Sequence, residues 1–141
     1  MTVVADVMTR NPRVVDPEAP LREALRIMRE GGFRRLPVVD RGVLRGMLSD
    51  RDLRQAMNTP VILHEREQDD YVLDHVKVGN CMTTEVFSLA PHDSLEKAAS
   101  LMKEKKVGGC PVLDGGTLVG IITESDLLEY LVKCLRAGRL L

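Results

Sequence analysis

The feature that most constrains the fold of this chain is an internal repeat with a fixed offset of 74 residues. Met-Thr at 8–9 recurs at 82–83, and the same offset, without a gap, pairs Pro37-Val38 with Pro111-Val112 and Asp52-Leu53 with Asp126-Leu127. A register held this long indicates two copies of one unit. We therefore divide the chain into a first repeat at 1–57, a linker at 58–77 that we expect to be helical, a second repeat at 78–135 and a tail at 136–141.

Both copies begin with the pattern of an amphipathic helix. Apolar residues recur at helical spacing, and in the first copy they are Leu21, Ala24, Leu25 and Met28. This spacing predicts a helix with one apolar face in each copy. Pro20 suits the first helical position, and the matching stretch Asp93-Ser94-Leu95-Glu96 is typical of an N-cap with a capping box.

A hairpin and a second helix follow in each copy. Two apolar runs flank a Gly-containing turn, which predicts β-hairpins at 36–48 and 110–122. A second helix is expected to start near Ser49 and near Thr123. Short extended pieces before the first helix complete a β-α-β-β-α unit; they lie at 13–15 and 87–89.

The unit predicts the fold class. A single β-α-β-β-α unit has a sheet with one face covered by helices and one face bare, so one copy alone should be unstable. Two copies packed sheet to sheet would bury both faces. We therefore expect an α+β fold of two β-α-β-β-α repeats packed about a pseudo-two-fold axis.

Composition excludes several classes of function. Hydrophobic residues at 44% and charged residues at 29% are typical of a soluble globular protein. No apolar run approaches the roughly 18 to 20 residues that span a bilayer, and no signal peptide is visible, so we expect a cytoplasmic protein with no membrane partner. Residues 4–57 carry 11 basic and 8 acidic residues, whereas 78–132 carry 4 and 8. This uneven charge, with aromatics at only 3%, argues against nucleic-acid binding.

The cysteines and histidines do not form a site. Cys81, Cys110 and Cys134 are odd in number and lack CxxC spacing, so we predict small buried residues rather than disulfides or structural zinc. No nucleophile–base constellation is evident, and we expect no enzyme activity, no metal and no required cofactor. The three histidines also lack metal-ligand spacing: His64, His75 and His92.

The pattern Gly-h-x-Ser/Thr-x-x-Asp stands once in each copy, at 46–52 and 120–126. A structural role explains its spacing. The Ser49 and Thr123 hydroxyls can cap the following helix, and the Asp three residues on can reach back as in a capping box. Capping therefore stays open as the whole role of these residues.

Ligand binding is the second interpretation of the same motif. Asp recurs where Glu or Gln is the better box partner. A short ionised carboxylate on the first helical turn can accept hydrogen bonds from both hydroxyls of a ribose cis-diol. We therefore predict that Asp52 and Asp126 bind ribose.

Phosphate groups should point away from these acidic helix starts and toward cations. Arg34 and Arg35, at the entry to the first hairpin, are the candidates because guanidinium binds phosphate oxygens bidentately. The second copy has Gly108 and Gly109 at the matching positions. A solvated strand entry is the alternative for the two arginines.

The chain resembles a stand-alone tandem pair of cystathionine-β-synthase (CBS) domains, also called a Bateman module. The resemblance rests on the Val-Met-Thr entry at 7–9, the Leu-Pro-Val-Val-Asp strand at 36–40 and the motif that occurs once in each copy. The resemblance implies a regulatory module that binds AMP, ADP, ATP or S-adenosylmethionine in the cleft between the repeats. It would signal by conformational change to an unidentified protein partner, and it would form a homodimer. A structural dimerisation module with vestigial nucleotide sites is the alternative.

The resemblance also implies which residues surround the ligand. Each motif would face the entry loop of the other repeat, and basic residues at positions 34 and 35 would face the phosphates. Next to the two aspartates, the ligand would contact motif residues Ser49, Arg51, Thr123 and Ser125. The adenine would be held by Thr9, Asn11, Pro12, Arg13 and Val14 and by Thr83, Val86, Phe87 and Ser88.

Overall fold

The computed structural model describes residues 2–57 and 66–139, and it builds this part from helices and two small antiparallel sheets. The predicted α+β class is confirmed. The chain divides into two compact units, Arg13–Val86 and Met1–Pro12 with Phe87–Leu141. We name them the Asp52 unit and the Asp126 unit after the motif that each contains. They are not the sequence repeats, because the entry segment of each repeat belongs to the unit of the other.

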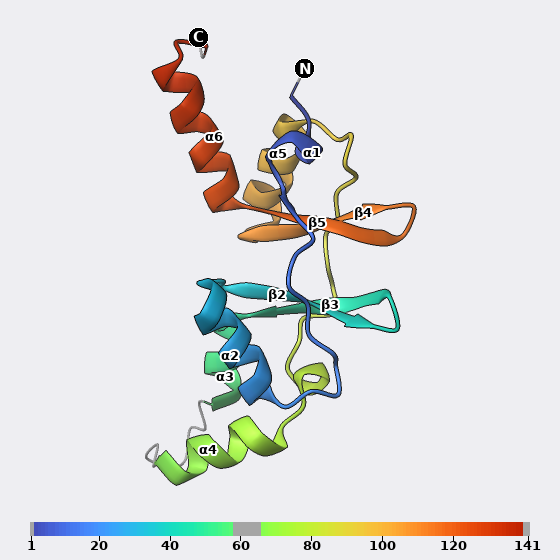
Figure 1. Ribbon diagram of the computed structural model, residues 1–141, viewed down its shortest axis with the longest axis vertical. Helices are drawn as coiled ribbons and strands as arrows, with labels where there is room; N and C mark the ends of the chain where they lie inside the picture. The colour runs from blue at the N-terminus through green and yellow to red at the C-terminus, as the bar shows by residue number, and fades with distance from the viewer. Residues whose placement is uncertain (1, 58–65, 140–141) are drawn as a thin grey trace. The chain divides into compact units, whose positions relative to one another are not determined.

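In the Asp52 unit, two helices cover one face of a β-hairpin (Figure 1). The predicted hairpin and helices are confirmed, with a bulge between Val38 and Val39. The elements are α2 (Leu21–Gly31), β2 (Arg35–Asp40), β3 (Val43–Ser49), α3 (Asp50–Met57), α4 (Arg66–His75) and the 3-10 helix η1 (Val78–Asn80).

The core of this unit follows the predicted apolar spacing. Leu21 and Ala24 on α2 are fully buried, and they belong to one cluster with Leu36 and Leu48 of the hairpin. Each such leucine contributes about 1.5–3 kcal/mol relative to an exposed side chain. Pro20 is the residue before α2 rather than its first residue, and the helix ends at Gly32, whose φ is 67°.

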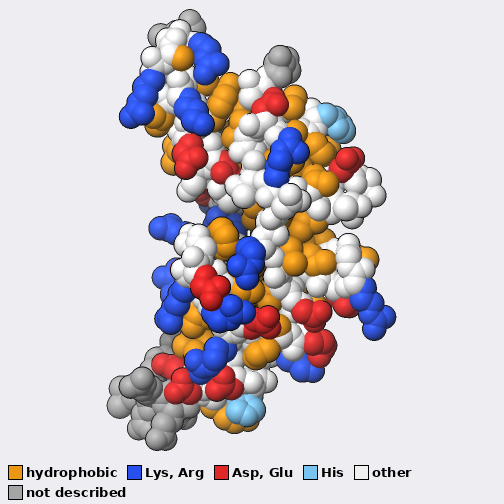
Figure 2. Space-filling view, viewed as in Figure 1, with side chains coloured by type: hydrophobic (Ala, Val, Ile, Leu, Met, Phe, Trp, Pro, Cys, Tyr) orange, Lys and Arg blue, Asp and Glu red, His pale blue; other side chains and the backbone are white. Residues whose placement is uncertain are grey.

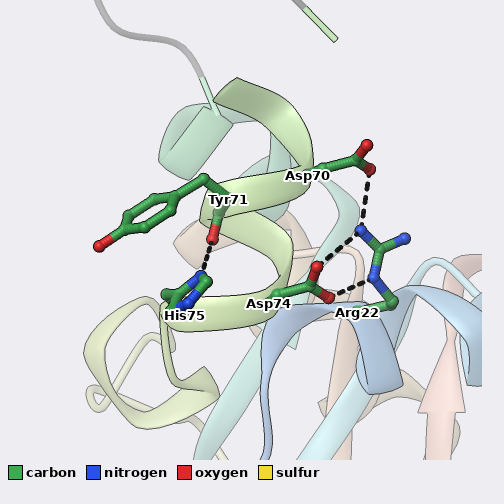
Figure 3. Close-up of polar contacts among 5 residues, drawn as sticks. All are labelled: Arg22, Asp70, Tyr71, Asp74 and His75. Atoms are coloured by element: carbon green, nitrogen blue, oxygen red, sulfur yellow. Dashed lines mark hydrogen bonds and ion pairs between the residues drawn. The ribbon is translucent and has the colours of Figure 1, made fainter. Parts of the chain in front are cut away.

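Helix α4 lies in the predicted linker and packs on the same core. Leu73 is buried in that cluster. On the outer side, the Arg22 guanidinium donates hydrogen bonds to the carboxylates of Asp70 and Asp74, and it lowers the pKa of Asp74 (Figure 3). The Tyr71 and His75 rings stack with centroids 4.1 Å apart. Linker residues 58–65, His64 among them, lie outside the described residues.

The Asp126 unit has a three-stranded sheet in the order β1-β5-β4, with its helices on one face (Figure 1). Cys110 and Cys134 are buried as predicted, whereas Cys81 of the other unit is half-buried. The elements are α1 (Val4–Val7), β1 (Thr9–Arg10), α5 (Leu95–Lys105), β4 (Gly109–Asp114), β5 (Thr117–Thr123) and α6 (Glu124–Arg136).

Two local expectations were wrong. Ser94 caps α5 by accepting a hydrogen bond from the Lys97 N–H, but the residue that would complete a capping box is Lys97, which has no acceptor. The extended pieces at 13–15 and 87–89 form only single parallel bridges, Val15 to Val38 and Leu89 to Val112. The chain turns directly after each bridge, which leaves no length for a strand.

Candidate functional site

Reciprocal capping holds the serine or threonine and the aspartate of each motif together. Ser49 N–H donates to Asp52 Oδ2 at 2.9 Å, and Asp52 N–H donates to Ser49 Oγ at 3.0 Å. In the other unit the same two bonds join Thr123 and Asp126 at 2.9 and 3.3 Å. The predicted capping geometry is therefore confirmed in both units, and it fixes both carboxylates at a helix start.

An entry-segment threonine approaches each carboxylate. Thr9 Oγ1 lies 3.4 Å from Asp126 Oδ1, and Thr83 Oγ1 lies 3.3 Å from Asp52 Oδ1. Both pairs join a motif to the entry segment of the other sequence repeat. Thr9 pairs with Ile121 in the β1–β5 ladder, and Thr83 exchanges two backbone hydrogen bonds with Met47.

The glycine at the head of each motif makes this approach possible, a role that the sequence analysis missed. A Cβ added to Gly120 would lie 2.9 Å from Thr9 O, and one added to Gly46 would lie 2.6 Å from Thr83 O. Backbone at that distance leaves no room for a side chain. The sequence did contain a signal for this close approach, because the motif glycine and the Met-Thr pair both recur in each copy.

Each carboxylate retains acceptor capacity. An ionised carboxylate has about four lone-pair sites. For Asp52, the Ser49 N–H and the Thr83 hydroxyl use two of them. The Asp52 side chain is half-buried rather than sealed. Asp52 can therefore accept hydrogen bonds from two further donors, the number that a vicinal diol supplies. Asp126 also accepts from the Thr123 hydroxyl at 3.1 Å, which leaves it one site.

The residues predicted to contact phosphate adjoin the Asp52 motif through the backbone. Arg35 is the register partner of Ser49, and Asp50 N–H donates to Arg34 O at 2.7 Å. The Asp126 motif has the same frame, with Gly109 opposite Thr123 and a 3.0 Å bond from Glu124 N–H to Gly108 O. Arg51 and Ser125, the second residues of α3 and α6, are exposed.

The predicted adenine loops are divided between the units. Of the first loop, Thr9, Asn11 and Pro12 belong to the Asp126 unit, where Asn11 N–H donates to Val119 O at 3.4 Å. Arg13 and Val14 belong to the Asp52 unit. Of the second loop, Thr83 and Val86 belong to the Asp52 unit and Phe87 and Ser88 to the Asp126 unit. Their contacts with adenine stay predictions.

The thiol of Cys81 is influenced by the Asp52 carboxylate. Burial raises the pKa of its thiol, and the Asp52 carboxylate raises it further. Because the thiolate is the reactive form, this environment opposes nucleophilic chemistry. Residues 2–57 and 66–139 contain no group of three or more His, Cys, Asp or Glu arranged to hold a metal ion, and no helix in these ranges is long and apolar enough to cross a membrane.

Comparisons with known proteins point to one family. The family model described as CBS domain matches residues 4–59 and 78–133. A CBS domain-containing protein of Dictyostelium discoideum is 36% identical over 135 residues, which cover 94% of this chain and 93% of the relative. Among solved structures, an acetoin utilization protein (AcuB) from Vibrio cholerae has a TM-score of 0.82 and 32% identity, covering 98% of this chain and 96% of its own. CBSX2, solved in complex with AMP, has a TM-score of 0.79 and 28% identity, covering 94% and 98%.

Proposed function

The chain belongs to the CBS domain family, and from this premise we propose that it is a non-catalytic regulatory module that binds an adenosine-containing ligand at the Asp52 and Asp126 motifs. One observation carries the proposal. Both aspartates are fixed by reciprocal capping at a helix start, and Asp52 keeps two acceptor sites for a diol while Asp126 keeps one beside the Thr9 and Thr123 hydroxyls. The similarity to CBSX2, which was solved with AMP, supports adenosine as the common part of the ligand.

In this proposal each residue type has a separate role. Asp52 and Asp126 accept hydrogen bonds from the ribose hydroxyls, and Ser49 and Thr123 hold the carboxylates in place. Arg34 and Arg35 bind phosphate oxygens, and Arg51 and Ser125 contact the ligand beside the motifs. The adenine lies against the predicted loop residues Thr9, Asn11 to Val14, Thr83 and Val86 to Ser88.

The ligand is AMP, ADP, ATP or S-adenosylmethionine, and it acts as a signal rather than as a cofactor. It can change the module only by binding one arrangement of the units better than another. A protein partner in the cytoplasm binds the surface that the ligand has changed.

The module also forms a homodimer through α6. Four apolar side chains at helical spacing lie on the outer face of α6: Leu128, Leu131, Val132 and Leu135, each at least 40% exposed. At Leu128 this face continues into a groove of about 540 Å³ between α5 and α6. Contiguous apolar surface of this kind marks interaction sites.

The face is self-complementary. In an antiparallel pair of α6 helices, Leu128 lies opposite Leu135 of the second copy, and the acidic first half of each helix meets the basic second half of the other. A parallel pair would instead place like charges together. Charge complementarity therefore favours a second copy as the occupant of this face.

A structural dimerisation module with vestigial sites is the second candidate function. Reciprocal capping alone accounts for the spacing of Ser49 and Asp52, which is the observation in its favour. In that case the function of the module is to form the dimer, and no small molecule affects the dimer.

Isothermal titration calorimetry and thermal shift with AMP, ADP, ATP and S-adenosylmethionine decide between the two functions. We expect saturable binding of at least one compound with a rise in melting temperature. Mass spectrometry of the native protein should find an adenosine derivative that co-purifies. A dimer that gives no heat and no thermal shift with any of the four compounds rejects the ligand-binding function and leaves the structural module.

A further inference from the structure

The two motifs share one backbone frame but differ in charge. Each has the reciprocal cap, the entry threonine and the same backbone hydrogen bond from the first α-helical residue to the strand entry. Because these contacts around the two carboxylates are equivalent, we attribute a difference in ligand preference to the side chains placed on that frame.

Four arginines stand on the frame of the Asp52 motif, and their counterparts are uncharged. With the two acidic residues of each motif, the formal charge is +2 at the Asp52 motif and −2 at the Asp126 motif. The arginines are Arg34, Arg35, Arg51 and Arg54, and their counterparts are Gly108, Gly109, Ser125 and Leu128. Figure 2 shows Lys and Arg side chains gathered over α2 and α3 of the Asp52 unit.

One of these arginines is placed by an ion pair. Arg54 Nη2 lies 3.0 Å from Asp50 Oδ2, so the acidic residue that would repel a phosphate beside Asp52 has a cation on the next turn. In the other motif the counterpart of that cation is Leu128, and Glu124 retains its charge at the helix start. Repulsion of phosphate is therefore stronger at the Asp126 motif.

The Asp126 unit has two lysines shortly before Gly108, and the structure gives each of them other neighbours. Lys105 Nζ lies 5.2 Å from the centroid of the Phe87 ring. Lys106 lines the groove between α5 and α6, together with Glu124. Neither lysine occupies the frame position of Arg34 or Arg35.

We propose that the two motifs take ligands of different charge: the Asp52 motif takes an adenosine 5′-phosphate, with preference rising with the number of phosphates, and the Asp126 motif takes an adenosine ligand whose 5′ substituent carries no phosphate. This proposal rests on the proposed function, because it assumes that both motifs bind adenosine. It adds the chemical class of the 5′ group at each motif. The arginines supply bidentate, charge-assisted hydrogen bonds that glycine cannot.

The test titrates the full-length chain with adenosine and with ATP by calorimetry. We expect adenosine to fill two sites per chain and ATP to fill one of them more tightly than adenosine does. The Arg34→Gly/Arg35→Gly variant copies the other motif and should lose about tenfold or more in ATP affinity, with adenosine affinity unchanged within about twofold. Added salt should weaken ATP binding and leave adenosine binding unchanged.

Two further variants keep the result interpretable. Arg34→Gln/Arg35→Gln removes the charge without adding glycine to a strand entry, and it should lose ATP affinity to the same extent. Gly108→Arg/Gly109→Arg moves the arginines to the other motif, where neither glycine has a positive φ, and it should create a second tight ATP site.

The outcomes separate the two hypotheses. If adenosine and ATP both fail to bind the wild-type chain, the proposed function falls and this assignment falls with it. If both bind, but the arginine variants leave ATP affinity unchanged or weaken adenosine and ATP equally, only the assignment of ligand charge is overturned.

Discussion

Thr9 Oγ1 lies 3.4 Å from Asp126 Oδ1 although 117 residues separate the two in the chain. The contact exists because Thr9 and Arg10 form a strand beside β5, the strand that leads into the Asp126 motif. Thr83 makes the equivalent contact with Asp52. Each ligand-binding candidate is thus oriented by a residue of the other sequence repeat.

Thr9→Val should weaken ligand binding more than it weakens the fold. The substitution keeps the shape of the side chain and removes the hydroxyl beside the Asp126 carboxylate. Thr9 is exposed, so we expect a loss of at most about 1 kcal/mol in unfolding free energy. Calorimetry should show weaker binding at one site per chain. Thr2→Val, which removes a hydroxyl bonded to Tyr130 of α6 instead of one beside Asp126, is the control. Equal effects of the two variants would contradict the orienting role.

Replacing the motif aspartates should separate capping from binding. Asp126→Ala and Asp52→Ala each remove a capping partner and should cost about 1 kcal/mol in unfolding free energy. Each should also abolish one binding site while the other persists. The matched Asn variants keep a side-chain oxygen for the cap but lose the charge, so they should be more stable than the Ala variants and still bind poorly. Variants that lose stability and bind normally would leave capping as the whole role of the motif.

Gly120→Ala should destabilise the Asp126 unit by about 1–3 kcal/mol, the usual cost of overpacking. The new Cβ would meet Met8 Sδ at 2.6 Å and Thr9 O at 2.9 Å. The methionine side chain can move and the backbone oxygen cannot. We therefore expect Met8→Ala to give little relief when urea unfolding compares the cost of Gly120→Ala in both backgrounds. If Gly120→Ala cost nothing in the Met8→Ala background, the Met8 side chain alone would limit the space at Gly120.

The sequence predicted most of the local structure because repeated local patterns determine it. The 74-residue offset placed the helices from Leu21 and Leu95, both hairpins, and the Ser49 and Thr123 caps. It did not predict α1 or β1, because Val4 to Arg10 is too short to show a period. The exchange of entry segments came only from the family resemblance, which implied that each motif faces the entry loop of the other repeat; the Thr9–Asp126 and Thr83–Asp52 contacts agree with it. Local patterns did not predict it, because pairing β1 with β5 is a non-local contact.

Acid should destabilise the Asp126 unit partly through Asp93. Its carboxylate accepts the Ala90 N–H at 2.7 Å and a Lys97 Nζ hydrogen bond at 3.1 Å, and chiefly the first bond lowers its pKa. A carboxyl with a lowered folded pKa stabilises the fold above its unfolded pKa of about 4, and this contribution is lost as the pH falls through the folded value.

Asp93→Asn should therefore lower the melting temperature near neutral pH, and the difference from wild type should shrink as the pH falls through the lowered folded pKa of Asp93. Melting curves from about pH 7 to pH 2 measure the difference. Glu96→Gln, which removes an exposed carboxylate on the first turn of α5, should give a curve nearly parallel to wild type. A wild-type minus Asp93→Asn difference that does not change with pH would contradict the role of the ionised carboxylate.

The apolar face of α6 should control the oligomeric state. Leu128 is 60% exposed and Leu135 is 58% exposed, so an aspartate at either position should change the unfolding free energy of the monomer by no more than about 0.5 kcal/mol. In an antiparallel α6 pair the same aspartate would be buried against the second copy without a partner. Sedimentation equilibrium should give twice the 15.7 kDa chain mass for the wild type and a single chain mass for Leu128→Asp or Leu135→Asp.

A charge exchange tests the antiparallel arrangement itself. On an antiparallel pair, Glu129 lies within about one helical turn of Arg136 of the second copy, on the same side of the apolar face. Glu129→Arg should therefore weaken the dimer by placing like charges together, and Glu129→Arg/Arg136→Glu should restore it. In a parallel pair the two-fold axis runs along the helices, so Glu129 and Arg136 of the second copy lie on opposite sides of the apolar face and Arg136→Glu would not rescue Glu129→Arg. Dimers unaffected by both the aspartate and the charge variants would place the interface elsewhere on the chain.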